Sequence, residues 1–147
     1  IDTAQRQGIG MDRLEFEVTE SVTLLGFQRD EVLSALRALQ AAGARVVMDD
    51  FGTGHSSLSN LKDFTFDKLK IDRSFVAAMS NHAPSASIVK ATIGLGKSLG
   101  LTIVAEGVEN EVQLTRLRRW GCDQVQGYLI GKPSREIASE SASSPVA

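Results

Sequence analysis

Short apolar runs alternate with longer stretches of helical periodicity along this 147-residue chain, and this alternation limits the possible folds more than any other feature. Five strands are expected, near residues 14–18, 45–49, 66–71, 101–105 and 123–128. Helices are expected between them, most clearly over residues 30–42, 86–99 and 111–120. Strands that alternate with helices indicate an α/β fold with parallel strands.

The expected helices have residues suited to their ends. Asp30 and Asn110 are predicted N-caps, because their side chains can accept a hydrogen bond from the first helical turn. Gly43, Gly100 and Gly121 follow the three helices, where a left-handed residue commonly ends a helix. The helix over residues 86–99 is predicted to bury one stripe, formed by Ile88, Thr92, Leu95 and Leu99.

Asp49 and Asp50 end a short apolar run, and a loop rich in glycine and serine follows them. Neighbouring residues on a strand point to opposite faces, so both carboxylates can converge only where the strand gives way to the loop. Two close carboxylates repel unless a cation lies between them, and Mg²⁺ and Mn²⁺ prefer such oxygen ligands. The pair therefore predicts a metal site. The alternative is that Asp49 caps a helix or a turn and Asp50 is solvated.

A polar residue lies near the C-terminal end of every expected strand: Glu17, Asp49, Lys70, Glu106 and Gln126. In a (β/α)8 barrel, functional residues come from this rim and from several strands. In an open sheet the same residues would mark a topological switch point. Five polar groups on one rim favour the barrel, although the alternation alone leaves both architectures open.

The composition is that of an ordinary globular domain, with 42% hydrophobic and 23% charged residues. A net charge of −2 argues against binding of DNA or RNA polymers. No apolar stretch approaches the ~20 residues of a membrane span. The single cysteine, Cys122, excludes an internal disulfide and fits a cytoplasmic protein. We expect it to be a buried structural thiol rather than a nucleophile.

Residues 91–98 read A-T-I-G-L-G-K-S, which resembles a relaxed phosphate-binding loop. Such a loop must follow a strand and open a helix. This stretch instead lies inside a helical periodicity and leads into a strand. Lys97 and Ser98 are therefore predicted to lie on a solvated helix face.

Five stretches resemble, in order, the motifs of the EAL domain, a bacterial phosphodiesterase that hydrolyses cyclic di-GMP. They are F-E-V-T-E-S (16–21), M-D-D-F-G-T-G-H-S-S-L (48–58), D-K-L-K-I-D-R-S-F-V (67–76), I-V-A-E-G-V-E-N (103–110) and V-Q-G-Y-L-I-G-K-P (125–133). The resemblance implies a modified (β/α)8 TIM-type barrel with one antiparallel strand. It also implies a role in bacterial second-messenger signalling.

The resemblance assigns a role to each matching residue. Glu17, Asp49 and Asp50 correspond to metal ligands, with Asp49 bridging two metals. The catalytic positions of the family correspond to Lys70, Glu106 and Gln126. Supporting or substrate-binding positions correspond to Asp72, Glu109 and Glu20, the last of which holds the glycine loop in the family.

The implied cofactor is a pair of Mg²⁺ or Mn²⁺ ions, which would lie about 3.5–4 Å apart and activate a water. Lys70 would orient this water and Glu106 would act as general base. The implied product is the linear dinucleotide.

The E-A-L motif itself and the family's downstream metal-binding asparagine are absent from the sequence. We therefore expect residues 1–133 to be the C-terminal part of an EAL domain, with about five of the eight strands, and residues 134–147 to be a flexible tail. The isolated chain is expected to be weakly active or inactive. The parent protein is expected to dimerise through the full domain, to carry an upstream sensor or diguanylate-cyclase-type domain, and to be cytoplasmic or membrane-anchored. The alternative function is a non-catalytic module that binds cyclic di-GMP or mediates dimerisation.

Overall fold

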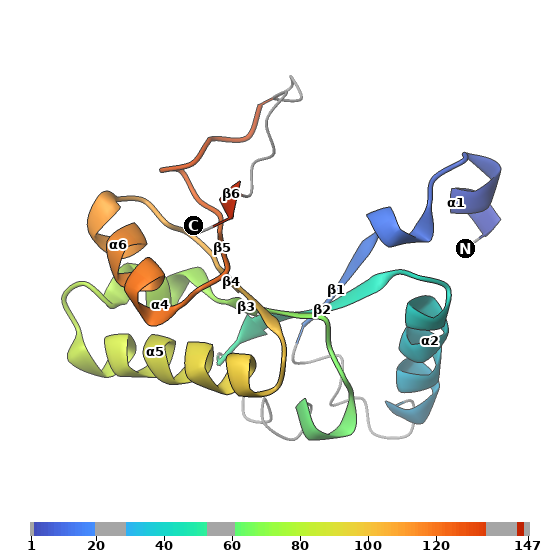
Figure 1. Cartoon of the computed structure of the whole chain (residues 1–147), viewed down its shortest axis with the longest axis horizontal. Helices are drawn as coiled ribbons and strands as arrows, with labels where there is room; N and C mark the ends of the chain where they lie inside the picture. Colours follow the sequence, from blue (N-terminus) through green and yellow to red (C-terminus); the bar gives the residue numbers. More distant parts are fainter. Residues whose placement is uncertain (1, 20–28, 53–60, 135–143, 146–147) are drawn as a thin grey trace. The chain divides into compact units, whose positions relative to one another are not determined.

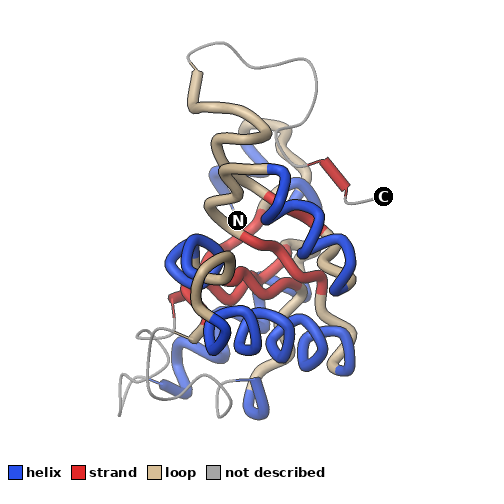
Figure 2. The backbone as a smooth tube through the Cα atoms, turned by 90° about the vertical axis from the view of Figure 1, so that its left-hand side faces the viewer, coloured by secondary structure: helices blue, strands red, loops and turns tan. Residues whose placement is uncertain are grey.

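The computed structural model describes residues 2–19, 29–52, 61–134 and 144–145. The chain divides into two compact units, Ile1–Lys68 and Leu69–Ala147. Strands and helices alternate along both units; Figure 1 gives their order by the colour of the sequence, and Figure 2 draws the helices in blue and the strands in red. This alternation confirms the predicted α/β class.

The first unit contains one parallel strand pair. Its elements are α1 (Asp2–Arg6), the short 3₁₀ helix η1 (Met11–Arg13), β1 (Glu15–Thr19), α2 (Arg29–Ala41) and β2 (Arg45–Phe51). Strands β1 and β2 run parallel, with Glu17 beside Val47 and Thr19 beside Asp49. Helix α2 contacts β2 and buries Leu33 and Leu36.

Two expectations about this unit were wrong. Helix α2 begins at Arg29, so Asp30 lies in its first turn instead of capping it, where its charge still complements the helix dipole. Strand β2 does not end at Asp49, as predicted, but continues to Phe51. Gly43 has a φ of 100°, which confirms the predicted left-handed residue after α2.

The second unit contains the remaining elements. They are β3 (Lys68–Ile71, whose first residue belongs to the first unit), α4 (Arg73–Ala78), α5 (Ala83–Ser98), β4 (Thr102–Ala105), α6 (Glu111–Trp120), β5 (Gln124–Val125) and β6 (Ser144–Pro145). Strand β5 pairs in parallel with β4 and antiparallel with β6. Helix α5 contacts α4, β4 and α6. Asn110 caps α6 and Gly121 ends it with a φ of 84°, both as predicted.

The buried face of α5 differs from the predicted stripe. The helix buries Ser85, Val89, Thr92, Ile93 and Gly96. The exposed fractions of Ile88 and Leu99 are 44% and 48%, so placing these two residues on the buried stripe was wrong. Small residues allow this face to approach β4 closely, because a Cβ on Gly96 would lie 2.1 Å from Ile103 Cδ1. Residues 91–98 lie within this helix, which confirms that they form no phosphate-binding loop.

An aspartate secures the beginning of β2. Asp67 Oδ2 accepts the Val46 N–H at 2.7 Å and the Gln40 side-chain amide of α2 at 2.9 Å. The Asp67 N–H donates in turn to the Val46 carbonyl at 2.9 Å. Asp67, which directly precedes β3, therefore binds both β2 and the helix before it.

Asp123 repeats this arrangement in the second unit. Its Oδ2 accepts the Ile103 N–H at 2.8 Å, and its own N–H donates to the Ile103 carbonyl at 3.2 Å. Its Oδ1 pairs with Lys97 of α5. Asp67 and Asp123, which we call the aspartate locks, each precede a strand and bind the second residue of an earlier one.

Several predictions fall on residues that the structure does not describe. This group includes Glu20, the loop over residues 53–60 and most of the predicted tail. Residues 61–63, which directly follow the undescribed loop, form a short helical stretch. Within the described parts of the chain, no helix has the length and hydropathy needed to span a membrane.

Candidate functional site

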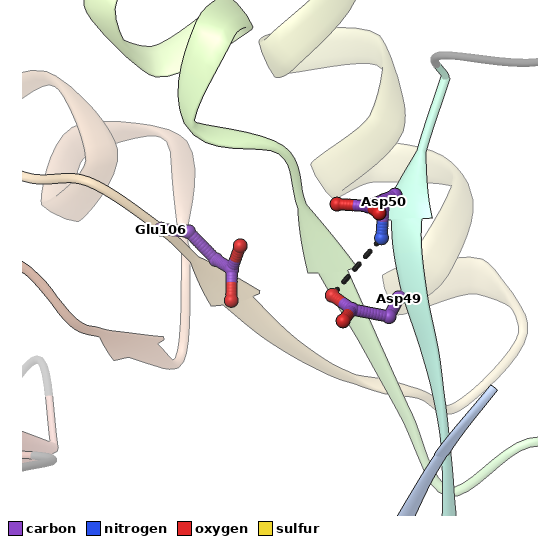
Figure 3. Close-up of side chains that lie close together, drawn as sticks. All are labelled: Asp49, Asp50 and Glu106. Carbon is purple, nitrogen blue, oxygen red and sulfur yellow. Dashed lines mark hydrogen bonds between the residues drawn. The ribbon is translucent and has the colours of Figure 1, made fainter. Parts of the chain in front are cut away.

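Asp49 and Asp50 converge through an unusual backbone conformation. Asp50 has a φ of 56°, which is rare for a residue other than glycine. Its N–H donates to Asp49 Oδ1 at 3.0 Å, as drawn in Figure 3. One carboxylate oxygen of each lies within 4.8 Å of the other, and both residues are half-buried. The convergence was predicted correctly, but a left-handed residue inside β2 produces it.

Such a conformation costs about 1–3 kcal/mol, and strained residues of this kind cluster at functional sites. Rotation at Asp50 brings its side chain toward that of its neighbour, which an ideal strand would direct to the opposite face. The strained backbone of Asp50 therefore brings two carboxylates together, and carboxylate oxygens are hard ligands of the kind that divalent cations prefer.

Glu17 lies in the middle of β1, not at its C-terminal end as predicted. It lies beside Val47 in the parallel register, and Asp49 is two residues further along β2. Because side chains alternate along a strand, Glu17 and Asp49 occupy the same face of the β1–β2 pair. This face of the first unit thus offers carboxylates that suit Mg²⁺ or Mn²⁺ in chemistry and arrangement.

The second unit brings three of the predicted residues into direct contact. Lys70 Nζ lies 2.7 Å from Glu106 Oε1, and the Gln126 side-chain amide donates to the same oxygen at 2.5 Å. Lys70 belongs to β3, while Glu106 and Gln126 directly follow β4 and β5. The Lys70 and Glu106 side chains are largely buried, so water screens this ion pair weakly.

The backbone around these residues joins the same strands. The Glu106 N–H donates to the Ile71 carbonyl at 3.1 Å, and the Gln126 N–H donates to the Ala105 carbonyl at 2.9 Å. Polar side chains at the ends of β3, β4 and β5 therefore meet at one rim of the second unit, as the positions of the strands in the sequence predicted.

Asp72 and Glu109 have different surroundings. Asp72 caps α4, where its carboxylate accepts the Ser74 N–H at 3.0 Å and the Ser74 hydroxyl. The Glu109 side chain is exposed, and its N–H donates to the Gln113 side chain at 2.8 Å. Asp72 thus caps a helix, whereas the Glu109 side chain is open to solvent.

A pocket of about 330 Å³ opens beside the Glu106 carboxylate. Its lining consists of Arg73, Glu106, Gly107, Glu109, Gln126, Gly127, Tyr128, Gly131 and Pro133. Sequence reasoning missed the contributions of Arg73 and Tyr128, although both lie within the recognised motifs. It also missed the role of Gly127, which has a φ of 155° and where a Cβ would lie 2.3 Å from Val108 N and O. Only glycine permits this approach between the two loops that form the pocket.

Cys122 plays no part in this chemistry. Burial raises the pKa of its thiol to about 11, so it is neutral near pH 7. Its S–H lies 3.2 Å from the Gln124 carbonyl and 3.5 Å from the Ile103 carbonyl. The prediction of a buried structural thiol is confirmed.

Comparison with known proteins identifies one family. The sequence pattern described as the EAL domain matches residues 1–133. The bifunctional diguanylate cyclase/cyclic di-GMP phosphodiesterase MucR of Pseudomonas aeruginosa is 44% identical over 128 residues, which are 87% of this chain and 18% of MucR.

Two solved structures show the same similarity. The MucR phosphodiesterase in complex with c-di-GMP superimposes with a TM-score of 0.83 at 42% identity, over 90% of this chain and 53% of the solved chain. BlrP1 of Klebsiella pneumoniae, solved as a manganese and cyclic di-GMP complex, gives a TM-score of 0.81 at 34% identity, over 90% of this chain and 33% of that one.

This similarity confirms the predicted fold class, an EAL-type TIM barrel of which the chain contains a part. The chain spans about half of the solved MucR domain. It spans between 15% and 30% of the length of the curated relatives that it matches.

Proposed function

This chain belongs to the EAL domain family, and on that premise we propose that it is part of a metal-dependent phosphodiesterase that hydrolyses cyclic di-GMP to the linear dinucleotide. The observation that carries the proposal is the cluster formed by Lys70, Glu106 and Gln126 beside an open pocket. MucR, which shares this family, is named a cyclic di-GMP phosphodiesterase and was solved with c-di-GMP.

The proposed cofactor is a pair of Mg²⁺ or Mn²⁺ ions. Glu17, Asp49 and Asp50 would hold them through their carboxylate oxygens. Support comes from the paired carboxylates of β2 and from the manganese in the BlrP1 complex. When bound, two such cations activate a water and stabilise the leaving oxygen of an in-line displacement at phosphorus.

The residues of the second unit have complementary tasks in this proposal. Glu106 accepts the proton of the attacking water as general base. The Lys70 ammonium group orients this water and offsets the negative charge that develops on the phosphate. The Gln126 amide fixes the orientation of the Glu106 carboxylate through its hydrogen bond to Oε1.

The supporting residues act around this centre. Glu109 lines the pocket and is proposed to contact the nucleotide. Asp72 supports the site indirectly by holding α4 directly after the strand that carries Lys70. The role predicted for Glu20 stays a prediction, because this residue lies outside the described ranges.

Hydrolysis of cyclic di-GMP, measured with Mg²⁺, with Mn²⁺ and with a chelator, tests the proposal. The assay compares the chain and an upstream-extended form. We expect cleavage to depend on the metal and Asp49→Asn to abolish it. Glu106→Gln is expected to lower kcat by about 10²–10⁴-fold, because the amide cannot accept the proton.

Glu111→Gln is the matched control, since Glu111 is an exposed residue at the start of α6. Equal activity of the control and the wild type is expected. If the chain and its upstream-extended form both bind the nucleotide but neither cleaves it with any metal, the catalytic assignment is refuted. The chain would then belong to a binding or dimerising module.

Three wider proposals concern the parent protein. It is proposed to form a homodimer through the complete domain, to carry an upstream sensor or cyclase-type domain, and to work in the cytoplasm or at a membrane anchor. The bifunctional name of MucR supports the upstream domain. Mass measurement of the extended protein in solution tests the homodimer.

A further inference from the structure

Gln113 is a buried polar residue that reaches beyond its own helix. It lies in the first turn of α6, and its exposed fraction is 3%. Its Oε1 accepts the N–H groups of Asn110 at 3.2 Å and Glu109 at 2.8 Å. Its Nε2 donates to the Val76 carbonyl of α4 at 3.2 Å. One side chain therefore joins two helices and the loop that precedes α6.

Capping of α6 requires only part of this arrangement. A capping box needs the bond between the Gln113 side chain and the Asn110 N–H, which glutamate could also make. The bond to the Val76 carbonyl needs a donor, which a glutamate carboxylate lacks. A charged side chain here would also face a buried carbonyl without compensation. The amide thus suits a connection between α4 and the loop better than a simple cap.

The loop held in this way carries Glu106. Four of its five N–H groups, those of residues 106, 108, 109 and 110, have hydrogen-bond acceptors in β3, in the loop after β5 and in Gln113. Val108 is fully buried and bonds through its N–H to the Gln126 carbonyl and through its carbonyl to the Leu129 N–H, both at 3.0 Å. Gln113 supplies the connection to α4, the helix that follows the strand of Lys70.

We propose that Gln113 is a positioning residue, which holds the Glu106 carboxylate against Lys70 by tying residues 106–110 to α4. The inference rests on the function proposed above for the chemistry of Glu106 and Lys70. Gln113 itself acts only through the loop. Its loss is expected to disturb the ion pair even though no atom of Gln113 belongs to that pair.

The test combines kinetics with a stability cycle. Gln113→Met removes the amide while keeping a similar shape, and Gln113→Glu keeps the acceptor but removes the donor to Val76. Asn110→Ala is the control, since it removes the cap of α6 and leaves the Gln113 side chain in place. We expect both Gln113 variants to lower kcat by about 10- to 100-fold, because small displacements of catalytic groups have effects of this size. KM is expected to change less than about twofold.

The second measurement needs no enzymatic activity. Urea unfolding of Lys70→Met, Glu106→Gln and the double variant gives the coupling between these two residues. Repeating the cycle with Gln113→Met present shows whether the coupling depends on Gln113, because uniform destabilisation cancels in the cycle. We expect the coupling to fall toward zero with Gln113→Met and to persist with Asn110→Ala.

The outcomes separate the two proposals. The positioning role is overturned if the coupling between Lys70 and Glu106 persists in Gln113→Met. It is also overturned if this coupling is lost in Gln113→Met while kcat stays unchanged. An equal loss of coupling in Asn110→Ala also overturns it, because capping alone would then explain the effect. Loss of coupling in Gln113→Met, together with an upstream-extended form that binds cyclic di-GMP but never cleaves it with any metal, supports the positioning role and refutes the proposed function.

Discussion

Replacing Gly96 with alanine tests how closely helix α5 is fitted to strand β4. An added Cβ would lie 2.1 Å from Ile103 Cδ1, 3.2 Å from Ile103 Cγ1 and 3.9 Å from Leu101 Cβ. The severe contact therefore involves the terminal methyl group of one flexible side chain. Ile103→Val removes that methyl group.

Opposing effects set the size of the change. Alanine in a helix interior is favoured over glycine by about 1 kcal/mol. Overpacking of a close-packed core costs about 1–3 kcal/mol. We expect Gly96→Ala to lower the free energy of unfolding by up to about 2 kcal/mol. Ile103→Val alone should lower it by about 0.5–1.5 kcal/mol. In the double variant the new methyl group fills the vacated space, so the double variant should be about 1–2 kcal/mol more stable than the sum of the single changes predicts.

Urea unfolding followed by circular dichroism measures the four free energies. Gly94→Ala is the control, because no atom lies within 4 Å of a Cβ added there. This exposed change should stabilise the chain by up to about 1 kcal/mol. Additive effects of Gly96→Ala and Ile103→Val would refute the reasoning, since they would mean that α5 moves away from β4 instead of meeting Ile103.

Three further predictions concern single residues. Asp67→Ala should lower the free energy of unfolding by about 1–3 kcal/mol, because the buried Val46 N–H loses its carboxylate acceptor; Asp67→Asn should cost less, and an equal cost in urea unfolding would contradict this. Cys122 should react with iodoacetamide at pH 8 far more slowly in the folded chain than in urea. Because burial raises the pKa of its thiol from 9.0 to about 11, the folded chain holds this proton more tightly, so stability should fall as the pH rises above about 9. Burial works to raise the pKa of Glu15, but its ion pairs with Lys68 at 2.7 Å and Arg45 at 3.3 Å together outweigh this and lower the pKa below 4.5. The folded chain therefore binds this proton less readily than the unfolded chain. Glu15 contributes to the free energy of unfolding above pH 4.5, and this contribution is lost as the pH falls below that value. Acid unfolding of Glu15→Gln should therefore depend less on pH in this range.

The predictable part of this structure depends on local chemistry. Asn110 and the glycines that follow α2 and α6 could be predicted because each satisfies a backbone requirement inside one short segment. The contacts of Lys70 and Gln126 with Glu106 followed from the regular geometry of strands that end on one rim.

The remaining features depend on contacts between distant segments. The stripe predicted for α5 was wrong because more than one apolar stripe runs along this helix. The buried one carries Val89 and Ile93, and on the same face Gly96 packs closely on Ile103 of β4. The left-handed Asp50 could not be foreseen, since its own preference opposes that conformation. The strand expected over residues 123–128 is shortened to Gln124–Val125, because the chain turns at Gly127 to contact Val108.

The connection that Gln113 makes to α4 also could not be predicted from local sequence patterns. The sequence shows a capping box from Asn110 to Gln113, and this alone explains a glutamine at that position. The donor bond to Val76, 37 residues away, appears only when α4 and α6 are in place.

The aspartate locks have a consequence for how this chain tolerates change. Each lock joins the amino end of a strand to the helix before it, and in the second unit this end lies opposite to the rim that carries Glu106. At the carboxyl ends, backbone hydrogen bonds from Glu106 to Ile71 and from Gln126 to Ala105 also join neighbouring strands, and these bonds do not depend on which side chains the rim carries. A protein engineer could then recombine the rim side chains of different homologues on one scaffold, provided that Asp67 and Asp123 are left in place.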